Sequence, residues 1–177
     1  MRTYRTENKV EIEQIKFVAN ALSKLVLNPV YTALYYNAET QWLIGTDSRR
    51  LHIVVFPMDI ETGFYKMIKD GKAIMLIDAN IDAQFPNYKQ IIPSEFSTVK
   101  TFVMPMDKTI AISKLTAVIN KNLDENACIN IDFVKDATIP TANVIVSNNK
   151  GLSPVMIEYK GKSAKAIIMP LQLKLED

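Results

Sequence analysis

The stretch Thr46-Asp47-Ser48-Arg49-Arg50-Leu51 is a short polar break between two apolar segments of the chain. The segments on either side, Gln41 to Thr46 and Leu51 to Phe56, are dominated by β-branched, aromatic and other apolar residues. Such composition favours strands, whereas Asp and Ser favour turns. The sequence therefore predicts two strands joined at Asp47-Ser48-Arg49, with a further strand upstream over Val30 to Tyr36.

Helical periodicity appears twice in the chain. Apolar side chains recur at helical spacing over residues 11–26, and Asn28-Pro29 follows as a stop signal. Residues 110–122 show the same period. Five more strands are predicted in the second half, over residues 98–104, 128–134, 143–147, 154–159 and 165–173. Two helices cannot cover both faces of a large parallel sheet, so the sequence favours an α+β fold with mostly antiparallel sheets.

A hairpin is predicted at residues 63–78. Asp70-Gly71 lies between the apolar runs 64–69 and 72–77, and Asp-Gly suits a type I′ turn because both central positions need positive φ. Residues 79–97 contain two prolines among polar residues and are predicted to form a long ordered connection.

Composition excludes several kinds of site. His52 is the only histidine and Cys128 the only cysteine, which excludes multi-histidine or multi-cysteine metal sites and disulfides within the chain. The five glycines form no nucleotide-binding motif. Asp78-Ala79-Asn80-Ile81-Asp82 opens like a calcium loop, but Ala83 and Lys89 stand where that loop needs glycine and glutamate. We therefore predict no metal, no cofactor and no enzymatic activity.

The chain is predicted to be cytoplasmic. Its first six residues are polar, and no apolar run approaches the roughly 20 residues that span a bilayer. The formal net charge of +2 neither requires nor excludes a nucleic-acid partner.

Three motifs, at residues 46–51, 85–93 and 169–173, together resemble the bacterial DNA polymerase III sliding clamps, the β-subunit family. The stretch 46–51 resembles the Thr-Asp-Gly-His-Arg-Leu loop in the middle domain of these clamps. Phe85-Pro86-Asn87-Tyr88-Lys89-Gln90-Ile91-Ile92-Pro93 resembles the Phe-Pro-Asp-Tyr-Arg-Arg-Val-Leu-Pro segment that closes that domain. Met169-Pro170-Leu171-Gln172-Leu173 resembles the Met-Pro-Met-Arg-Leu with which such clamps end.

The resemblance implies a DNA-clamp-like α+β fold. Two βαβββ-type halves, approximately 1–97 and 98–177, would form a single clamp-like domain with two helices packed on one face of curved antiparallel sheets. In the family these helices line a ring around duplex DNA, and the loop and C-terminal segment form a pocket for linear peptides of polymerases and other replication proteins. The pocket residues implied here are Thr46, Arg50, Leu51, Pro86, Met169, Pro170 and Leu171.

The sequence also departs from the family. Ser48 and Arg49 replace the loop's glycine and histidine, and Ser48 narrows the freedom of the backbone. Gln172 replaces a basic residue, and Lys174-Leu175-Glu176-Asp177 extends beyond the usual end. A clamp chain carries three such domains. This chain has room for one, so a ring would need about six copies arranged head to tail.

Candidate DNA contacts lie on the two predicted helices. If the helices face a ring, phosphates would meet Lys16, Asn20 and Lys24 on the first helix and Lys114 and Lys121 on the second. Ordinary solvation of an outer helix face is the alternative, and Glu13 on the same stripe argues against DNA contact.

Three functions follow from these observations. The first is a non-enzymatic clamp-like protein that binds double-stranded DNA, replication proteins or both, and oligomerises into a ring. The second is a monomeric or dimeric protein-interaction module or decoy with the same fold and no DNA binding. The third is an enzyme on an unrelated α+β fold, which would use Asp47, Arg49, Arg50 and His52.

Overall fold

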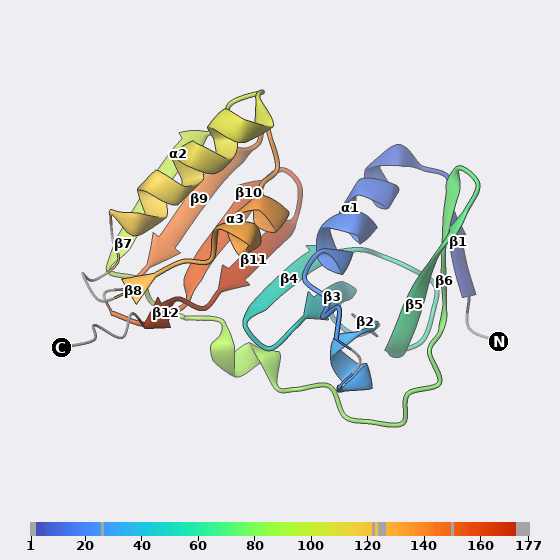
Figure 1. Ribbon diagram of the computed structural model, residues 1–177. Helices are drawn as coiled ribbons and strands as arrows, with labels where there is room; N and C mark the ends of the chain where they lie inside the picture. Colours follow the sequence, from blue (N-terminus) through green and yellow to red (C-terminus); the bar gives the residue numbers. More distant parts are fainter. Residues whose placement is uncertain (1–2, 26, 122, 124–126, 150, 173–177) are drawn as a thin grey trace. The chain divides into compact units, whose positions relative to one another are not determined.

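The computed structural model describes residues 3–25, 27–121, 123, 127–149 and 151–172 (Figure 1). The chain forms two compact units: unit 1, Met1–Pro86, and unit 2, Asn87–Asp177. The division between the two halves was predicted near residue 97. That the two units make up one clamp-like domain stays a prediction. No helix among the described residues is long and apolar enough to cross a membrane.

Unit 1 is an antiparallel sheet with a helix on one face (Figure 1). The strands follow the order β1-β6-β5-β2-β3-β4, and α1 contacts β3 and β4. The elements of unit 1 are β1 (Thr3–Thr6), α1 (Lys9–Ala19), a 3₁₀ helix (Pro29–Tyr31), β2 (Leu34–Asn37), β3 (Trp42–Thr46), β4 (Arg50–Val55), β5 (Gly63–Asp70) and β6 (Ala73–Asp78).

Polar contacts fix the start of α1. The Asn8 side chain accepts a hydrogen bond from the Val10 amide at 2.9 Å, which caps the helix N-terminus. Glu11 in the first turn accepts a hydrogen bond from the Tyr4 hydroxyl at 2.7 Å and so ties the helix to β1. Burial and the neighbouring Glu11 carboxylate raise the pKa of Tyr4 to about 12. Tyr4 is therefore a neutral donor to Glu11 at physiological pH.

The first helix ends earlier than the sequence predicted, at Ala19 rather than residue 26. In a continuing helix the Phe17 carbonyl would accept the Ala21 amide, but that amide donates to the Val18 carbonyl at 3.1 Å. The Phe17 carbonyl accepts instead from His52 Nδ1 at 2.7 Å. A side chain from a distant strand thus satisfies the helix end, which local periodicity could not reveal.

The segment predicted as a strand over 30–36 is also divided. Asn28 caps the 3₁₀ helix Pro29–Tyr31 through its side chain, and proline suits the first position of such a turn. Only Leu34–Asn37 is extended. The hairpin at 63–78 forms as expected, with β5 and β6 paired antiparallel. The turn was predicted one residue too early: Asp70 pairs with Ala73, so Gly71 and Lys72 form the turn. Of the predicted pair Asp70-Gly71, Gly71 alone has positive φ, +57°, so the type I′ turn centred on that pair was wrong.

Unit 2 repeats the arrangement of helices on one face of an antiparallel sheet (Figure 1). The strand order is β11-β10-β9-β7, and β12 pairs separately with β8. The elements of unit 2 are a 3₁₀ helix (Tyr88–Ile91), β7 (Thr98–Val103), α2 (Lys108–Asn120), β8 (Ala127–Cys128), α3 (Ile131–Ala137), β9 (Asn143–Asn148), β10 (Val155–Lys160), β11 (Ala164–Ile168) and β12 (Leu171–Gln172).

The prediction of a strand over residues 128–134 was wrong for the residues after Cys128. Asn130 accepts the Asp132 amide at 2.8 Å and starts the third helix, α3. Its buried side chains are Phe133, Val134 and Ala137, a helical spacing that the β-type composition concealed. The predicted strand 165–173 is likewise broken at Met169-Pro170, since proline has no amide for the ladder. The antiparallel α+β class is confirmed, with one helix more than predicted.

Gly45 provides a stability test of the helix-sheet contact. A Cβ atom at Gly45 would overlap the Val18 carbonyl oxygen and lie 3.1 Å from Val18 Cγ1, so Gly45→Ala should push α1 away from β3. We expect the free energy of unfolding to fall by about 2 kcal/mol, as for other overpacked interiors. Urea unfolding measures the change. A Gly45→Ala protein as stable as the original would contradict the close approach.

Candidate functional site

The loop between β3 and β4 is held by one carboxylate. Asp47 Oδ1 accepts hydrogen bonds from the backbone amides of Arg49 and Arg50, both at 3.0 Å. Asp47 Oδ2 lies 3.0 Å from Arg50 Nε, and the two side chains are only 14% and 8% exposed. Thr46 Oγ1 donates to the Arg50 carbonyl at 2.7 Å. The loop is therefore preorganised, with Arg50 neutralised inside it and Arg49 exposed.

Ser48 takes the conformation that a glycine would favour. Its φ is +77°, in the left-handed region where a Cβ is costly. The sequence resemblance placed a glycine at this position in the clamp loop. Ser48 thus occupies a backbone conformation that favours glycine, and the serine carries the strain.

The predicted pocket residues fall in both units. Thr46, Arg50 and Leu51 lie together at the ends of β3 and β4, and all three are buried. Pro86 is exposed at the end of unit 1. Met169, Pro170 and Leu171 belong to unit 2, where Pro170 is buried and Leu171 is exposed on β12. Since the seven residues are divided between the units, the pocket as a whole stays a prediction. The extension after Gln172 lies outside the described residues.

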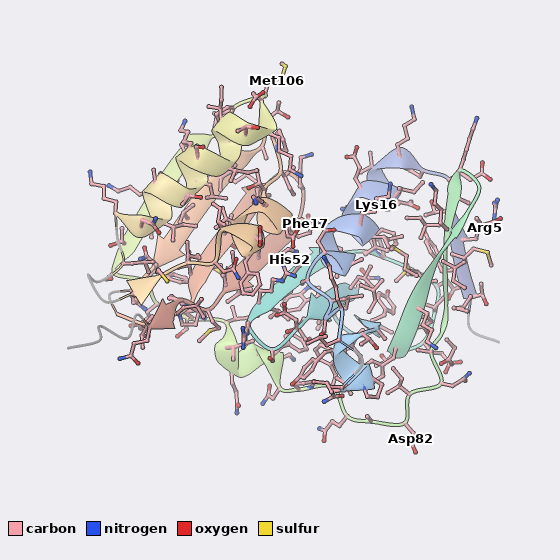
Figure 2. The ribbon with its side chains drawn as sticks, in the orientation of Figure 1. Arg5, Lys16, Phe17, His52, Asp82 and Met106 are labelled. Carbon is pink, nitrogen blue, oxygen red and sulfur yellow. The ribbon has the colours of Figure 1, made fainter. Side chains whose placement is uncertain are left out.

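The solvent-facing side of α1 carries both signs of charge. Lys9, Glu13, Lys16 and Asn20 are exposed at helical spacing, so a carboxylate lies between the two lysines (Figure 2 labels Lys16). The helix ends at Ala19, and Lys24 is therefore not on α1 as predicted. Lys24 is exposed in the segment that follows. Of the three DNA contacts that were predicted to share one face of this helix, Lys16 and Asn20 remain.

The solvent-facing side of α2 is more uniformly basic. Lys108, Lys114 and Lys121 are exposed, and no acidic residue occurs from Lys108 to Lys121. Lys114 Nζ donates to the Val103 carbonyl at 3.1 Å and lies 4.9 Å from the centre of the Phe102 ring. Lys108 was not among the predicted DNA contacts because the predicted helix began at residue 110. The Asp107 N-cap, which accepts the Ile110 amide at 2.9 Å, was the signal for the earlier start.

His52 serves the helix-sheet contact rather than a solvent-accessible site. It is fully buried, its ring stacks on Phe17 at 4.5 Å, and its Nδ1 meets the Phe17 carbonyl (Figure 2). A carbonyl oxygen can only accept, so Nδ1 carries the proton. Because the ring is fully buried, the structure does not favour the role that the enzyme alternative gives to His52. Within the residues that the structure describes, no three potential ligands gather as a metal site.

Comparisons with known proteins point consistently to one fold. No protein-family model matches the chain, and no curated protein resembles it in sequence. The DNA polymerase III β subunit of Thermotoga maritima superposes with a TM-score of 0.69 at 13% identity, over 98% of this chain and 66% of that one. The β subunit of Borrelia burgdorferi gives 0.67 at 14% identity, over 98% and 65%.

A Helicobacter pylori β clamp bound to a DNA ligase peptide gives a TM-score of 0.59 at 14% identity, over 97% of this chain and 66% of that one. This chain therefore spans just under two thirds of the length of the clamps it matches. Sequence identities this low establish the shared fold alone. That fold is the one of the bacterial sliding clamps, as the sequence motifs predicted.

The left-handed conformation of Ser48 can be tested by stability. Ser48→Gly should raise the free energy of unfolding by about 1 kcal/mol, because glycine adopts positive φ without a Cβ clash. Ser113→Gly is the matched control: at this exposed position inside α2 it should lower stability by about 0.5 kcal/mol. Urea unfolding of both variants provides the comparison. If Ser48→Gly and Ser113→Gly changed the free energy of unfolding in the same direction, the proposed strain at Ser48 would be contradicted.

Proposed function

We propose that this protein, which shares the fold of the bacterial sliding clamps, is a non-enzymatic cytoplasmic clamp that holds duplex DNA and assembles head to tail into a ring. The observation that carries the proposal is the basic surface of α2. Lys108 and Lys114 are exposed on this helix and Lys121 is exposed at its C-cap, just after the helix on which it was predicted, with no carboxylate from Lys108 to Lys121.

The lysines of α2 suit phosphate contact without base readout. Lys114 and Lys121 are seven residues apart, about two helical turns, and so lie on the same side of the helix. Lysine meets a phosphate as a flexible point charge, which gives affinity but carries no sequence information. On α1, by contrast, Glu13 offsets the neighbouring lysines. We therefore assign the larger part of the DNA contact to α2.

Two strands provide edges for assembly. Among the described residues, β1 pairs only with β6, and β7 pairs only with β9. An unpaired strand edge offers amides and carbonyls to another chain. Val99 and Val103 on β7 are 56% and 58% exposed, which adds apolar surface at that edge. Pairing β7 of one copy with β1 of the next is a head-to-tail contact, and such contacts can close into a ring.

DNA binding by α2 has a measurable salt signature. In the triple variant Lys108→Gln, Lys114→Gln, Lys121→Gln, the slope of log binding constant against log salt should become less steep by about 2.7, since each phosphate contact contributes about 0.9. A fluorescently labelled 30-base-pair duplex, titrated at several salt concentrations, measures the slope.

The matched control changes three exposed lysines of the β5–β6 hairpin, Lys66, Lys69 and Lys72, to glutamine. The net charge changes equally, so the control should leave the slope within about 1 of the original. Equal effects of the two triple variants would mean that only net charge matters. No salt-sensitive binding by the original protein would contradict DNA binding altogether.

Ring formation is tested by mass in solution. One chain has a mass of 20.0 kDa, so a ring would sediment as a defined multiple of that value. Replacing the apolar side chains at the β7 edge, as in Val99→Lys with Val103→Lys, should return the protein to a monomer, because charged side chains at a strand edge disfavour pairing with another chain. Sedimentation equilibrium over a range of protein concentrations gives the masses. A monomer at every concentration would contradict the ring.

The second candidate is a protein-interaction module without DNA binding. The ordered β3–β4 loop favours it, because a preorganised loop binds a peptide at a smaller entropic cost. The Helicobacter pylori clamp of the same fold was bound to a DNA ligase peptide. The loop in unit 1 and the segment Met169, Pro170 and Leu171 in unit 2 are each candidates for peptide contact, as the sequence resemblance implies.

A labelled peptide of DNA ligase serves as the probe for the predicted contact at Leu171. Leu171→Glu should weaken its binding at least about tenfold by placing a charge on exposed apolar surface, measured by fluorescence anisotropy. Leu152→Glu, in the same unit and outside the predicted pocket, should leave binding unchanged. Peptide binding with no effect of Leu171→Glu would place the peptide elsewhere.

A further inference from the structure

Unit 1 contains a cavity of about 510 Å³ that takes no part in the loop or helix surfaces described above. It lies where β2, the start of β5 and the end of β6 meet the segment 80–85. Its wall includes three aromatic rings, two carboxylates and an amide: Tyr35, Phe64, Phe85, Asp78, Asp82 and Asn80. This volume is within the usual range for small-ligand and side-chain pockets, about 300–1,000 Å³.

The aromatic wall is a fixed stack. Tyr35 and Phe85 lie parallel, with ring centroids 4.3 Å apart and an interplanar angle of 9°. Phe64 packs against both, with its centroid 5.3 Å from Tyr35 and 5.9 Å from Phe85. The two phenylalanines are buried, whereas Tyr35 is partly exposed. The position of the Tyr35 ring in the cavity lining is thus fixed by its contacts with Phe64 and Phe85.

The charge of the cavity has one sign. Asp78 and Asp82 are the charged side chains of its lining, and the lining contains no lysine, arginine or histidine. Asp78 Oδ1 accepts the Asn80 amide at 2.8 Å, which orients this carboxylate. Figure 2 shows Asp82 at the outer edge of the segment, where it contributes to the rim. In the part of the chain that is described, neither carboxylate is in an ion pair.

We propose that this cavity binds the guanidinium group of an arginine in an extended segment of a partner protein. A guanidinium is planar and cationic, so it stacks on an aromatic ring and donates to a carboxylate at the same time. Here the ring is Tyr35 and the oriented acceptor is Asp78, with Asp82 adding attraction from the rim. The site lies wholly within unit 1 and requires neither DNA binding nor a ring.

The charge and shape of the cavity favour arginine over other occupants. An acidic peptide or a phosphate would meet two carboxylates and no compensating cation. An ammonium group would pair with Asp78 but would use less of the flat ring surface than a guanidinium does. A partner's arginine would fill the cavity and leave its backbone at the surface.

Two synthetic peptides test the proposal. The probe is the blocked pentapeptide Gly-Ser-Arg-Ser-Gly, and its control carries citrulline, a neutral group of nearly the same shape, in place of arginine. We expect the arginine peptide to shift the backbone amide NMR signals of residues 62–64 and 78–85 in a saturable way. The citrulline peptide should bind at least about tenfold more weakly, because the charge-assisted hydrogen bond is lost.

Two variants locate the contact. Asp78→Asn should weaken binding of the arginine peptide at least about tenfold, and Tyr35→Leu should also weaken it by removing the ring. Asp59→Asn is the control, since it makes the same charge change at an exposed position outside the cavity. Amide spectra of the free variants show whether each is folded.

Several outcomes would overturn the proposal. Equal binding of the arginine and citrulline peptides would show that charge recognition is absent. Equal loss in Asp78→Asn and Asp59→Asn would reduce the effect to net charge. Saturable binding of spermidine with none of the peptide would indicate a small-molecule amine site instead. None of these results bears on duplex binding or ring formation, so the two proposals fail separately.

Discussion

The structure of unit 1 depends on the contact between the end of α1 and the β3–β4 hairpin. His52 donates from Nδ1 to the Phe17 carbonyl and stacks on the Phe17 ring, which closes the helix from the side. Gly45, directly opposite His52 in the ladder, has no side chain and lets the Val18 carbonyl approach the sheet. His52 supplies the hydrogen bond that the end of α1 needs, and Gly45 leaves space for that end to approach the sheet.

This contact also determines what the hairpin presents at its turn. With β3 and β4 fixed under the helix, the loop between them is completed by Asp47, which binds two backbone amides and the Arg50 guanidinium. The buried pair leaves Arg49 as the exposed cation of the loop. Burial therefore decides which of the two arginines can contact a partner: Arg49 is exposed and Arg50 is buried.

Charge is distributed unevenly over a molecule whose total is close to neutral. The net charge of +2 conceals an α2 surface with lysines alone, an α1 surface of mixed sign, and a cavity with carboxylates alone. Surfaces of opposite sign within one small protein can serve partners of opposite charge, since screening limits each field to about 8–10 Å at physiological salt. The sliding-clamp fold gives these surfaces a common scaffold, and the proposals above depend on their local chemistry.

The sequence by itself determined the antiparallel α+β class, the 63–78 hairpin and the likeness to sliding clamps, because turn residues and strand composition are local signals. Its failures had two causes: a distant residue completes the end of α1, and local capping residues outweigh the composition at the starts of α2 and α3. The end of α1 needs His52, and so Lys24 could not be excluded from the helix in advance. The α3 helix needed the Asn130 cap to outweigh β-type composition, and the earlier start of α2 brought in Lys108. The cavity joins residues from 35 to 85, a combination that only tertiary packing brings together.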